Sequence, residues 1–348
     1  MAIEASAINT HNTGTEPDPG PLMQLGLGFF GSRAFLSAIE LDLFSLVAAE
    51  PLSEAQIMEH LQLHPRSSRD FLDALVSLGV LQRSDGRYGN TPETAAFLDH
   101  AKPGYIGGFF AMCAQRLYPF WGHLTEALRT GQAQNESKSG GNPFSMLYSD
   151  PQKLKIFLNS MTGLSLHTGR TIAANFPWDR CKSFVDIGGA QGAVAVQIAL
   201  AHPHLQGTVF DLAQVGTVAR RYIRSFDLED RVRFQRGDFF EDPLPQTDVL
   251  IMGHILHDWS LEEKLTLLHK AHSALPEGGA LIVFDMMIDN SRSTNSAGLL
   301  MSLNMLIETP GGFDYTPADC QEWLSSTGFR DSSVMPLGHT ESIVIARK

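Results

Sequence analysis

The stretch Phe184-Val185-Asp186-Ile187-Gly188-Gly189-Ala190-Gln191-Gly192 decides the fold. It is an apolar run that ends in a glycine-rich turn, and a helix-compatible segment follows from Ala193 to Ala201. Such a turn lets the backbone approach a ligand closely, and the N-terminus of the helix offers unpaired N–H groups. The spacing D-x-G-G-x-x-G differs from the G-x-G-x-x-G of dinucleotide-binding folds. Because most isolated stretches of this kind are only tight turns, the following segments must decide what it binds.

Two further β-rich runs also end in acidic residues, one at Asp211 and the next at Asp238. In open α/β sheets, ligands bind outside the carboxyl ends of the strands. We therefore expect Asp211 to accept hydrogen bonds from ribose hydroxyls at a solvent-facing strand end, although it could instead cap the next helix. Asp238 could accept from an adenine amino group, with Phe239 or Phe240 against the ring. Together with Asp186, these strand ends favour a nucleoside-containing cofactor.

A fourth predicted strand, Asp248 to Met252, leads into Ile255-Leu256-His257-Asp258-Trp259. With this segment the chain resembles class I S-adenosylmethionine-dependent methyltransferases. More narrowly, it resembles the small-molecule O-methyltransferases that include plant caffeate and flavonoid enzymes, acetylserotonin O-methyltransferase and bacterial aromatic-polyketide tailoring enzymes. The Leu-His-Asp-Trp segment is the specific signal. The other supporting segments run in order along the chain: Val185–Gly189, Gly237–Phe240, Pro276–Gly279, Ser302–Leu306 and Gly311–Gly312.

The resemblance implies S-adenosyl-L-methionine as the cofactor and S-adenosyl-L-homocysteine as its product. Ala190 stands where many relatives have glycine, and Gly253 stands where plant relatives often have lysine. His254 and His257 could be read as metal ligands, but no third well-placed ligand is evident, so we expect no metal. The residues expected to bind the cofactor are Asp186, Gly188, Gly189, Asp211, Leu212, Asp238, Phe239 and Gly253.

The resemblance places the catalytic base at His257. A neutral imidazole can take the proton of a phenol, whose pKa is about 10, as the methyl group is transferred. The structural alternative is a capping or core histidine. Asp285 and Asp314 match positions where the plant enzymes carry glutamate and would orient the base. Each aspartate is one methylene shorter, so contact with His257 is not assured, and Glu308 is a possible substitute.

Residues expected to contact the substrate share an apolar or amide character within helical segments. Methionine adapts to flat aromatic ligands, although a methionine at helical spacing is as often part of a core. Asn304 is the strongest of them, because a polar amide in an apolar segment needs a partner and the resembled acetylserotonin enzymes use this position for substrate. The full set is Phe157, Met161, Met301, Asn304 and Met305.

The composition limits the broad class of protein. The chain has 348 residues, enough for about two domains, and its net charge of −12 argues against a general nucleic-acid binder. Its three cysteines are far apart, so neither a disulfide framework nor a structural zinc site is indicated. We expect no apolar run of membrane-spanning length. The polar start reads as a disordered tail rather than a signal peptide, and a cytoplasmic protein is the default.

Helix, helix, helix and hairpin signals between residues 22 and 100 form a winged-helix pattern. The would-be recognition segment carries only Arg66 and Arg69 as cations, which is thin for DNA contacts. In the resembled family this module is a dimerisation domain that helps close the partner's substrate pocket, so we expect a homodimer. The expected divisions are a tail at 1–21, the winged-helix dimerisation domain at 22–100, a helical linker and substrate-pocket region at 101–180, and the cofactor-binding domain at 181–348.

The expected fold is therefore α/β: a Rossmann-like class I methyltransferase domain after an N-terminal α-helical winged-helix domain. The expected function is O-methylation of a hydroxylated aromatic small molecule of secondary metabolism, without nucleic-acid or membrane partners. Alternatives within enzymes are methylation at nitrogen or carbon, or another reaction type in the same pocket. The alternative outside enzymes is a winged-helix regulator that senses the cofactor or a metabolite.

Overall fold

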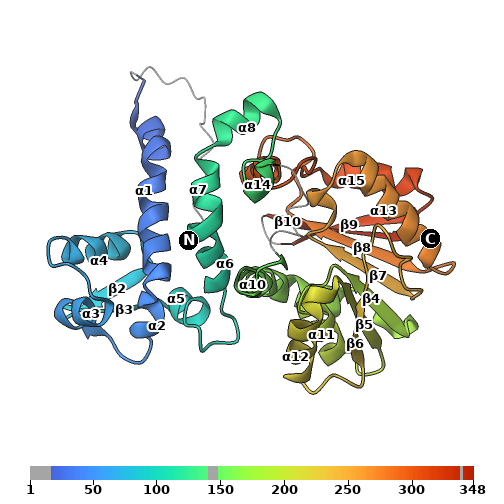
Figure 1. Ribbon diagram of the computed structural model, residues 1–348, viewed down its shortest axis with the longest axis horizontal. Helices are drawn as coiled ribbons and strands as arrows, with labels where there is room; N and C mark the ends of the chain where they lie inside the picture. Colours follow the sequence, from blue (N-terminus) through green and yellow to red (C-terminus); the bar gives the residue numbers. More distant parts are fainter. Residues whose placement is uncertain (1–16, 140–147, 338–339) are drawn as a thin grey trace. The chain divides into compact units, whose positions relative to one another are not determined.

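The computed structural model describes residues 17–139, 148–337 and 340–348 (Figure 1). Most of the expected tail at 1–21 lies outside these residues, and the first helix already begins at Gly20. The chain divides into two compact units, Met1–Gln115 and Arg116–Lys348. Each unit has its own hydrophobic core and is described by itself.

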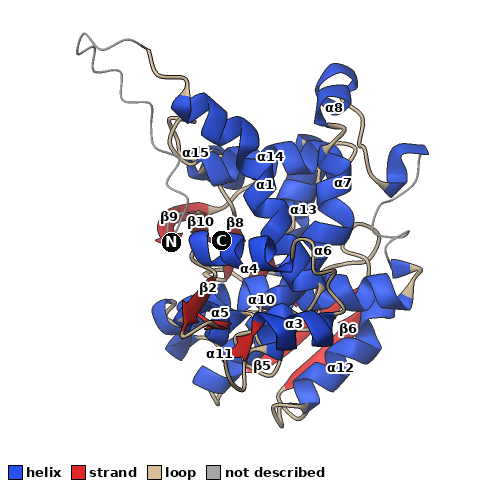
Figure 2. Cartoon of the chain, turned by 90° about the vertical axis from the view of Figure 1, so that its left-hand side faces the viewer, coloured by secondary structure: helices blue, strands red, loops and turns tan. Residues whose placement is uncertain are grey.

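The N-terminal unit has the predicted order of helices followed by a hairpin (Figure 2). Ser53 caps the second long helix through a capping box with Gln56, as its sequence predicts. Asp85 and Gly86 both have positive φ, which fits the two-residue hairpin turn. Its elements are α1 (Gly20–Glu40), α2 (Leu43–Leu46), β1 (Leu52–Ser53), α3 (Glu54–Leu61), α4 (Ser68–Ser77), β2 (Leu81–Ser84), β3 (Arg87–Asn90), α5 (Pro92–Phe97) and α6 (Gly107–Met112).

Helix α1 departs from one expectation. It is 21 residues long, and its most apolar 18-residue stretch has a mean hydropathy of 1.3, so by length and composition it could cross a membrane. The expectation that no apolar run reaches this length was wrong, because the helix runs on through small residues between its large apolar ones. Only 11% of its most apolar window is buried. Its exposed large side chains are Leu22, Met23, Leu25, Leu27, Phe29 and Phe30.

The C-terminal unit is a seven-stranded sheet of order β6-β5-β4-β7-β8-β10-β9. The strands from β4 to β8 are mutually parallel, while β10 runs antiparallel to both β8 and β9. This mostly parallel sheet is that of the expected Rossmann-like domain, and the edge strand β9 was not among the strands expected from the sequence. The strands are β4 (Ser183–Ile187), β5 (Gln206–Asp211), β6 (Val232–Arg236), β7 (Val249–Gly253), β8 (Ala280–Asp285), β9 (Arg330–Leu337) and β10 (Glu341–Arg347).

Helices cover both faces of this sheet (Figure 1). Successive residues of β8 alternate between two cores: Ile282 and Phe284 pack in the core with α10, α11 and α12, while Leu281 and Val283 pack in the core with α13 and α15. The helices are α7 (Tyr118–Trp121), α8 (Leu124–Thr130), α10 (Pro151–Asn175), α11 (Ala193–Ala201), α12 (Gly216–Arg224), α13 (Leu261–Ala274), α14 (Ser296–Glu308) and α15 (Pro317–Ser326). Short helical segments are η1 (Cys113–Leu117), η2 (Glu136–Ser139), η3 (Trp178–Arg180), η4 (Ala213–Val215) and η5 (Leu256–Asp258).

The strand order places the site. The chain leaves β4 toward β5 and β6, then returns to β7 on the other side of β4. At this switch of direction the connections after β4 and β7 diverge and leave a crevice at the carboxyl edge of the sheet. The glycine-rich turn after β4 and the Leu-His-Asp-Trp segment after β7 therefore face the same crevice.

Candidate active site

A pocket with an empty volume of about 990 Å³, including its open mouth, lies at this edge. Its wall contains every residue expected to bind the cofactor: Asp186, Gly188, Gly189, Asp211, Leu212, Asp238, Phe239 and Gly253. The structure thus brings together in one wall residues that lie up to 67 positions apart in the sequence (253 minus 186).

The turn after β4 requires its glycines. Gly188 and Gly192 have φ of 62° and 89°, in the region that L side chains rarely adopt. A Cβ at Gly189 would lie 2.7 Å from the Asp186 carboxylate carbon. Ala190 also has a positive φ, of 51°, and its N–H donates to Asp211 Oδ2 at 2.8 Å. Backbone conformation therefore shapes this part of the pocket.

Two buried carboxylates stand at the ends of β4 and β5. Burial raises the pKa of Asp186 to about 7, helped by the nearby charge of Asp211, and burial raises the pKa of Asp211 to about 6. Asp186 Oδ2 has no hydrogen-bond partner among the described residues. Asp211 is only 7% exposed and also accepts from the N–H of Leu212, so the expected solvent-facing position was wrong: the glycine-rich turn folds over it.

The other wall of the pocket is aromatic. Phe239 and Phe240 pack edge-to-face against Trp259, with ring centroids 5.8 and 4.6 Å away. Asp238 does not point freely into the pocket, because its Oδ1 accepts from the N–H of Phe240 at 2.9 Å. Its carboxylate holds the turn that presents the two rings.

The absence of a side chain at Gly253 is explained by packing. A Cβ at this position would lie 1.9 Å from the ring of Phe284, which comes from the paired position on β8. The ring of Phe284 lines the pocket in its place. A lysine, as plant relatives often carry here, would not fit beside this ring.

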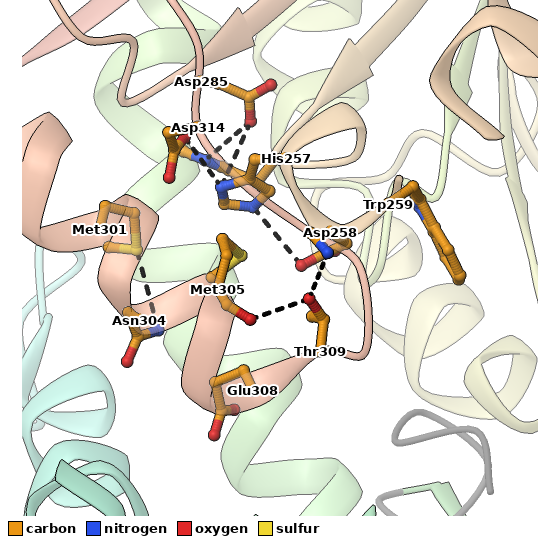
Figure 3. Close-up of polar contacts among 12 residues, drawn as sticks. His257, Asp258, Trp259, Asp285, Met301, Asn304, Met305, Glu308, Thr309 and Asp314 are labelled. Atoms are coloured by element: carbon orange, nitrogen blue, oxygen red, sulfur yellow. Dashed lines mark hydrogen bonds and ion pairs between the residues drawn. The ribbon is translucent and has the colours of Figure 1, made fainter. Parts of the chain in front are cut away.

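His257 lies on η5 beside three carboxylates (Figure 3). Its Nδ1 is 3.3 Å from Asp314 Oδ1 and 3.8 Å from Asp285 Oδ1, and its Nε2 is 3.7 Å from Asp258 Oδ1. Both predicted partners therefore lie within ion-pair distance of the imidazole despite their shorter side chains, and neither contact has hydrogen-bond geometry. The second oxygen of Asp285 accepts a hydrogen bond from the hydroxyl of Tyr315, a buried residue that sequence reasoning missed.

The charges of this cluster shift its titration. Burial alone would lower the pKa of His257, but Asp285, Asp258 and Asp314 outweigh it and raise that pKa to about 10. Burial raises the pKa of Asp285 to about 7 and that of Asp258 to about 6, against the opposing charge of His257. The neighbouring His254 goes the other way: burial and the charge of His257 lower its pKa to about 3.

Lys264 on α13 is a second residue that sequence reasoning missed. It is fully buried, and its ammonium donates to the carbonyls of Trp259 and Phe313 at 2.6 and 3.1 Å. The sequence carries a signal for it, because Lys264 occupies the apolar stripe of its helix, three and four residues before Leu267 and Leu268. A lysine at such a position needs polar partners.

The expected substrate residues separate into two groups. Phe157 and Met161, on α10, line the pocket. Met301, Asn304 and Met305, on α14, are not among the described residues that line it. In Figure 3 they lie on the helix below the His257 cluster.

The partner that Asn304 needs is within the chain: its Oδ1 accepts from Trp121 Nε1 at 2.8 Å. Glu308, the possible substitute partner of His257, instead forms an ion pair with Arg116, which also binds Glu136. Glu308 therefore does not replace Asp285 or Asp314, because its carboxylate is turned toward the guanidinium.

A third possible metal ligand is present beside His254 and His257, contrary to the expectation from the sequence. Atoms of His254, His257 and Asp285 lie within 4.8 Å of one another, so a third possible ligand is present. The sequence did not reveal it because Asp285 comes from the end of a different strand, β8. The spacing would admit a metal ion, and the same three side chains also form the charge network around the imidazole.

The comparisons with known proteins agree with this fold. Residues 121–330 match the model of the O-methyltransferase domain, and residues 23–100 match the O-methyltransferase dimerisation domain. The chain is 44% identical to the tetracenomycin polyketide synthesis 8-O-methyl transferase TcmO of Streptomyces glaucescens, over 95% of this chain and 97% of the relative. The chain therefore belongs to the O-methyltransferase family and is an S-adenosylmethionine-dependent enzyme of that family.

Two further relatives bear on the chemistry. The chain is 39% identical to the N,N-dimethyltransferase OxyT of Streptomyces rimosus, over 78% of this chain and 80% of the relative. The crystal structure of human N-acetylserotonin methyltransferase in complex with SAM superposes with a TM-score of 0.87 at 30% identity. That superposition covers 97% of this chain and 99% of the human one. The predicted Rossmann-like domain and N-terminal helical domain are confirmed.

Proposed function

We propose that this protein is a homodimeric O-methyltransferase that acts on a hydroxylated aromatic molecule of secondary metabolism, with His257 as the general base. One observation carries the role of His257: its imidazole lies 3.3 Å from Asp314 and 3.8 Å from Asp285, beside a pocket that Asp258 lines. A buried imidazole held by carboxylates on one nitrogen leaves the other to accept a proton.

The pocket fits S-adenosyl-L-methionine in two respects. The unpartnered Oδ2 of Asp186 is available to a ligand donor, and Gly188 and Gly189 leave space beside the backbone that a side chain would fill. Buried carboxylates also favour a cationic ligand. When bound, the cofactor supplies a methyl group on a sulfonium cation. The eight residues named above would hold it, and we propose that no metal takes part.

The reaction requires the acceptor oxygen to lie in line behind the methyl carbon and to lose its proton. Phe157, Met161 and Trp259 would position the acceptor, and positioning supplies much of the rate. His257 Nε2, on the side of Asp258, would take the proton in the neutral form of the imidazole, and the raised pKa of His257 shifts that form toward alkaline pH. Asp285 and Asp314, facing Nδ1, would stabilise the imidazolium that forms.

An aromatic acceptor is supported by the side chains around the pocket and by the relative TcmO, whose name gives a polyketide. Phe157, Met161 and Trp259 present flat or adaptable apolar surfaces to it. We propose that Met301, Asn304 and Met305 extend this surface from α14 when the acceptor is larger than the pocket described here.

N-methylation is the second candidate, because the relative OxyT is an N,N-dimethyltransferase. The two are separated by one experiment. The protein is incubated with methyl-labelled cofactor and a panel of matched polycyclic aromatics that carry either a phenol or an amine. Mass spectrometry then locates the label. Methyl on a phenolic oxygen supports the proposal, and methyl only on amine nitrogen would replace it with the second candidate.

The homodimer is supported by the match of residues 23–100 to a dimerisation domain and by the exposed apolar side chains of α1. We propose that a second copy of this chain covers them and that its corresponding domain helps close the substrate pocket. In this proposal α1 does not enter a membrane, the acidic chain binds no nucleic acid, and the enzyme works in the cytoplasm.

Light scattering tests the dimer. Leu25 is 81% exposed on α1, and Leu25→Glu should give monomer or aggregate because it places a charge in an apolar interface. Leu200→Glu, at an exposed leucine of α11, is the matched control and should leave the dimer intact. A monomeric wild-type protein would refute the proposal, and binding of the wild type to lipid vesicles would favour a membrane role for α1.

A further inference from the structure

Lys264 is a buried cation without a place in the reaction described above. Its ammonium lies 3.4 Å from the ring centre of Phe313 and donates to two backbone carbonyls, those of Trp259 and Phe313. Removing a charge from water is costly unless such partners replace the solvent. A chain that required only packing here would be served by leucine, as at Leu267 and Leu268 on the same stripe.

The two carbonyls belong to separate segments of the catalytic cluster. Trp259 follows directly after His257 and Asp258, and Phe313 directly precedes Asp314. One ammonium on α13 therefore connects the segment that carries the base to the segment that carries its carboxylate. The separation of 3.3 Å between His257 and Asp314 depends on how these two segments lie relative to each other.

The charge of Lys264 also acts on the cluster. Burial lowers the pKa of Lys264 to about 8, while Asp285, Asp314 and Asp258 oppose that shift, so the side chain stays charged at neutral pH. The titratable groups around His257 are Asp258 on η5, His254 after β7, Asp285 on β8, Asp314 and Tyr315 before α15, and Lys264 with Glu263 on α13. Apart from the two histidines, Lys264 is the member of this set that carries a positive charge.

We propose that Lys264 is a positioning residue for methyl transfer, which fixes the His257 segment against the Asp314 segment and whose charge opposes protonation of the base. This inference rests on the proposed role of His257. Without the ammonium, a positive charge that repels the imidazolium is gone, so the pKa of His257 rises and a higher pH is needed before a neutral imidazole is available.

The test is Lys264→Met, which keeps the length of the side chain and removes the charge. We expect kcat to fall about 10- to 100-fold, because small misplacements of catalytic groups are costly. We expect the acid limb of the pH–rate profile to move up by about 1 pH unit. Cofactor affinity should stay within about twofold of wild type, because Lys264 does not line the pocket.

Lys348→Met is the matched control. Lys348 donates to the carbonyls of His272 and Leu275 at 2.6 and 2.7 Å, so its loss also removes two such hydrogen bonds, at the other end of α13. We expect a lower melting temperature but a wild-type kcat and acid limb. If Lys264→Met changes only the melting temperature, as this control does, the proposal is overturned.

Lys264→Gln keeps a hydrogen-bond donor without the charge, and it decides the question if the methionine variant does not fold. Its acid limb should move in the same direction, and an unmoved limb would overturn the proposal. The ring of His257 is also titrated by NMR in the wild type and in the variant. A shifted ring titration together with an active His257→Ala enzyme would support the coupling to Lys264 while refuting His257 as the base.

Discussion

The two halves of the active site are built by different means. In the cofactor half, the positive φ angles of Gly188 and Gly192 and the strand ends at Asp186 and Asp211 shape the pocket. In the catalytic half, buried charges from three separate segments meet around His257. The first half is a property of local backbone and the second a property of tertiary packing. The two should therefore fail separately when residues are changed.

The largest effect should come from His257→Ala. We expect kcat to fall by about 10²–10⁴-fold for an acceptor that must lose a proton, because the base is gone. Cofactor affinity, measured by calorimetry, should stay near wild type, because His257 is not among the described residues that line the pocket. Full turnover by this variant would mean that positioning alone suffices, and would move nitrogen or carbon methylation ahead of O-methylation.

The converse change is Asp211→Asn in the cofactor half. We expect cofactor affinity to weaken about 10- to 100-fold, since an amide is a poorer acceptor than a carboxylate for buried donors. The N–H groups of Ala190 and Leu212 donate to different oxygens of Asp211, so the single oxygen of Asn keeps one of these two hydrogen bonds. The fold should persist with a lower melting temperature. Calorimetry gives the cofactor affinity of this variant, and the acid limb of its pH–rate profile is measured alongside. Unchanged affinity, or a shifted acid limb, would show that the two halves are not separate.

A smaller effect is expected for Asp285→Asn. It removes one of the carboxylates that raise the pKa of His257. With less stabilisation of the imidazolium, that pKa falls and the neutral base is available at lower pH, so the acid limb should move down by about 1–2 pH units. At its optimum kcat should fall about 10-fold, less than for His257→Ala, because the base remains but is poorly oriented. An acid limb that stays in place would separate Asp285 from the base.

The smallest effect should come from removing metal ions. His254, His257 and Asp285 have a spacing that a metal ion could use, but the proposed mechanism needs none. Dialysis against a chelator should leave kcat within about twofold of its starting value. A loss of activity that returns on adding one divalent ion would assign these three side chains to a metal centre and would remove His257 as a free base.

The same division explains which features the sequence predicts. The cofactor half follows from contiguous signals, a β-run, a glycine turn and an acidic strand end, so its residues could be named from the chain alone. Gly253 could be named but not explained, because the ring that fills its space belongs to Phe284 on the neighbouring strand. The local sequence pattern predicts at which strand end a residue of the cofactor half lies, but it does not predict which residue of a neighbouring strand it contacts.

The catalytic half was predicted in its members but not in its connections. The sequence pattern identified Asp285 and Asp314 as candidates. Whether these side chains, which are shorter than glutamate, come close to His257 depends on packing that a pattern does not encode. Tyr315, which donates to Asp285, gave no local signal. Lys264 did give one, as a lysine within an apolar stripe, but its partners come from segments on either side of α13 in the sequence.

Gly253 and Phe284 have a consequence for the history of this pocket. A side chain at 253 and the ring at 284 would occupy the same volume, so the order in which the two positions change matters. A lineage could gain a lysine at 253 only after the ring had become small, and the opposite order would pass through a protein with overlapping atoms. Substitutions at the pair should therefore be non-additive. Exchanging this pair for a lysine and a smaller residue is therefore a two-step path in which position 284 changes first.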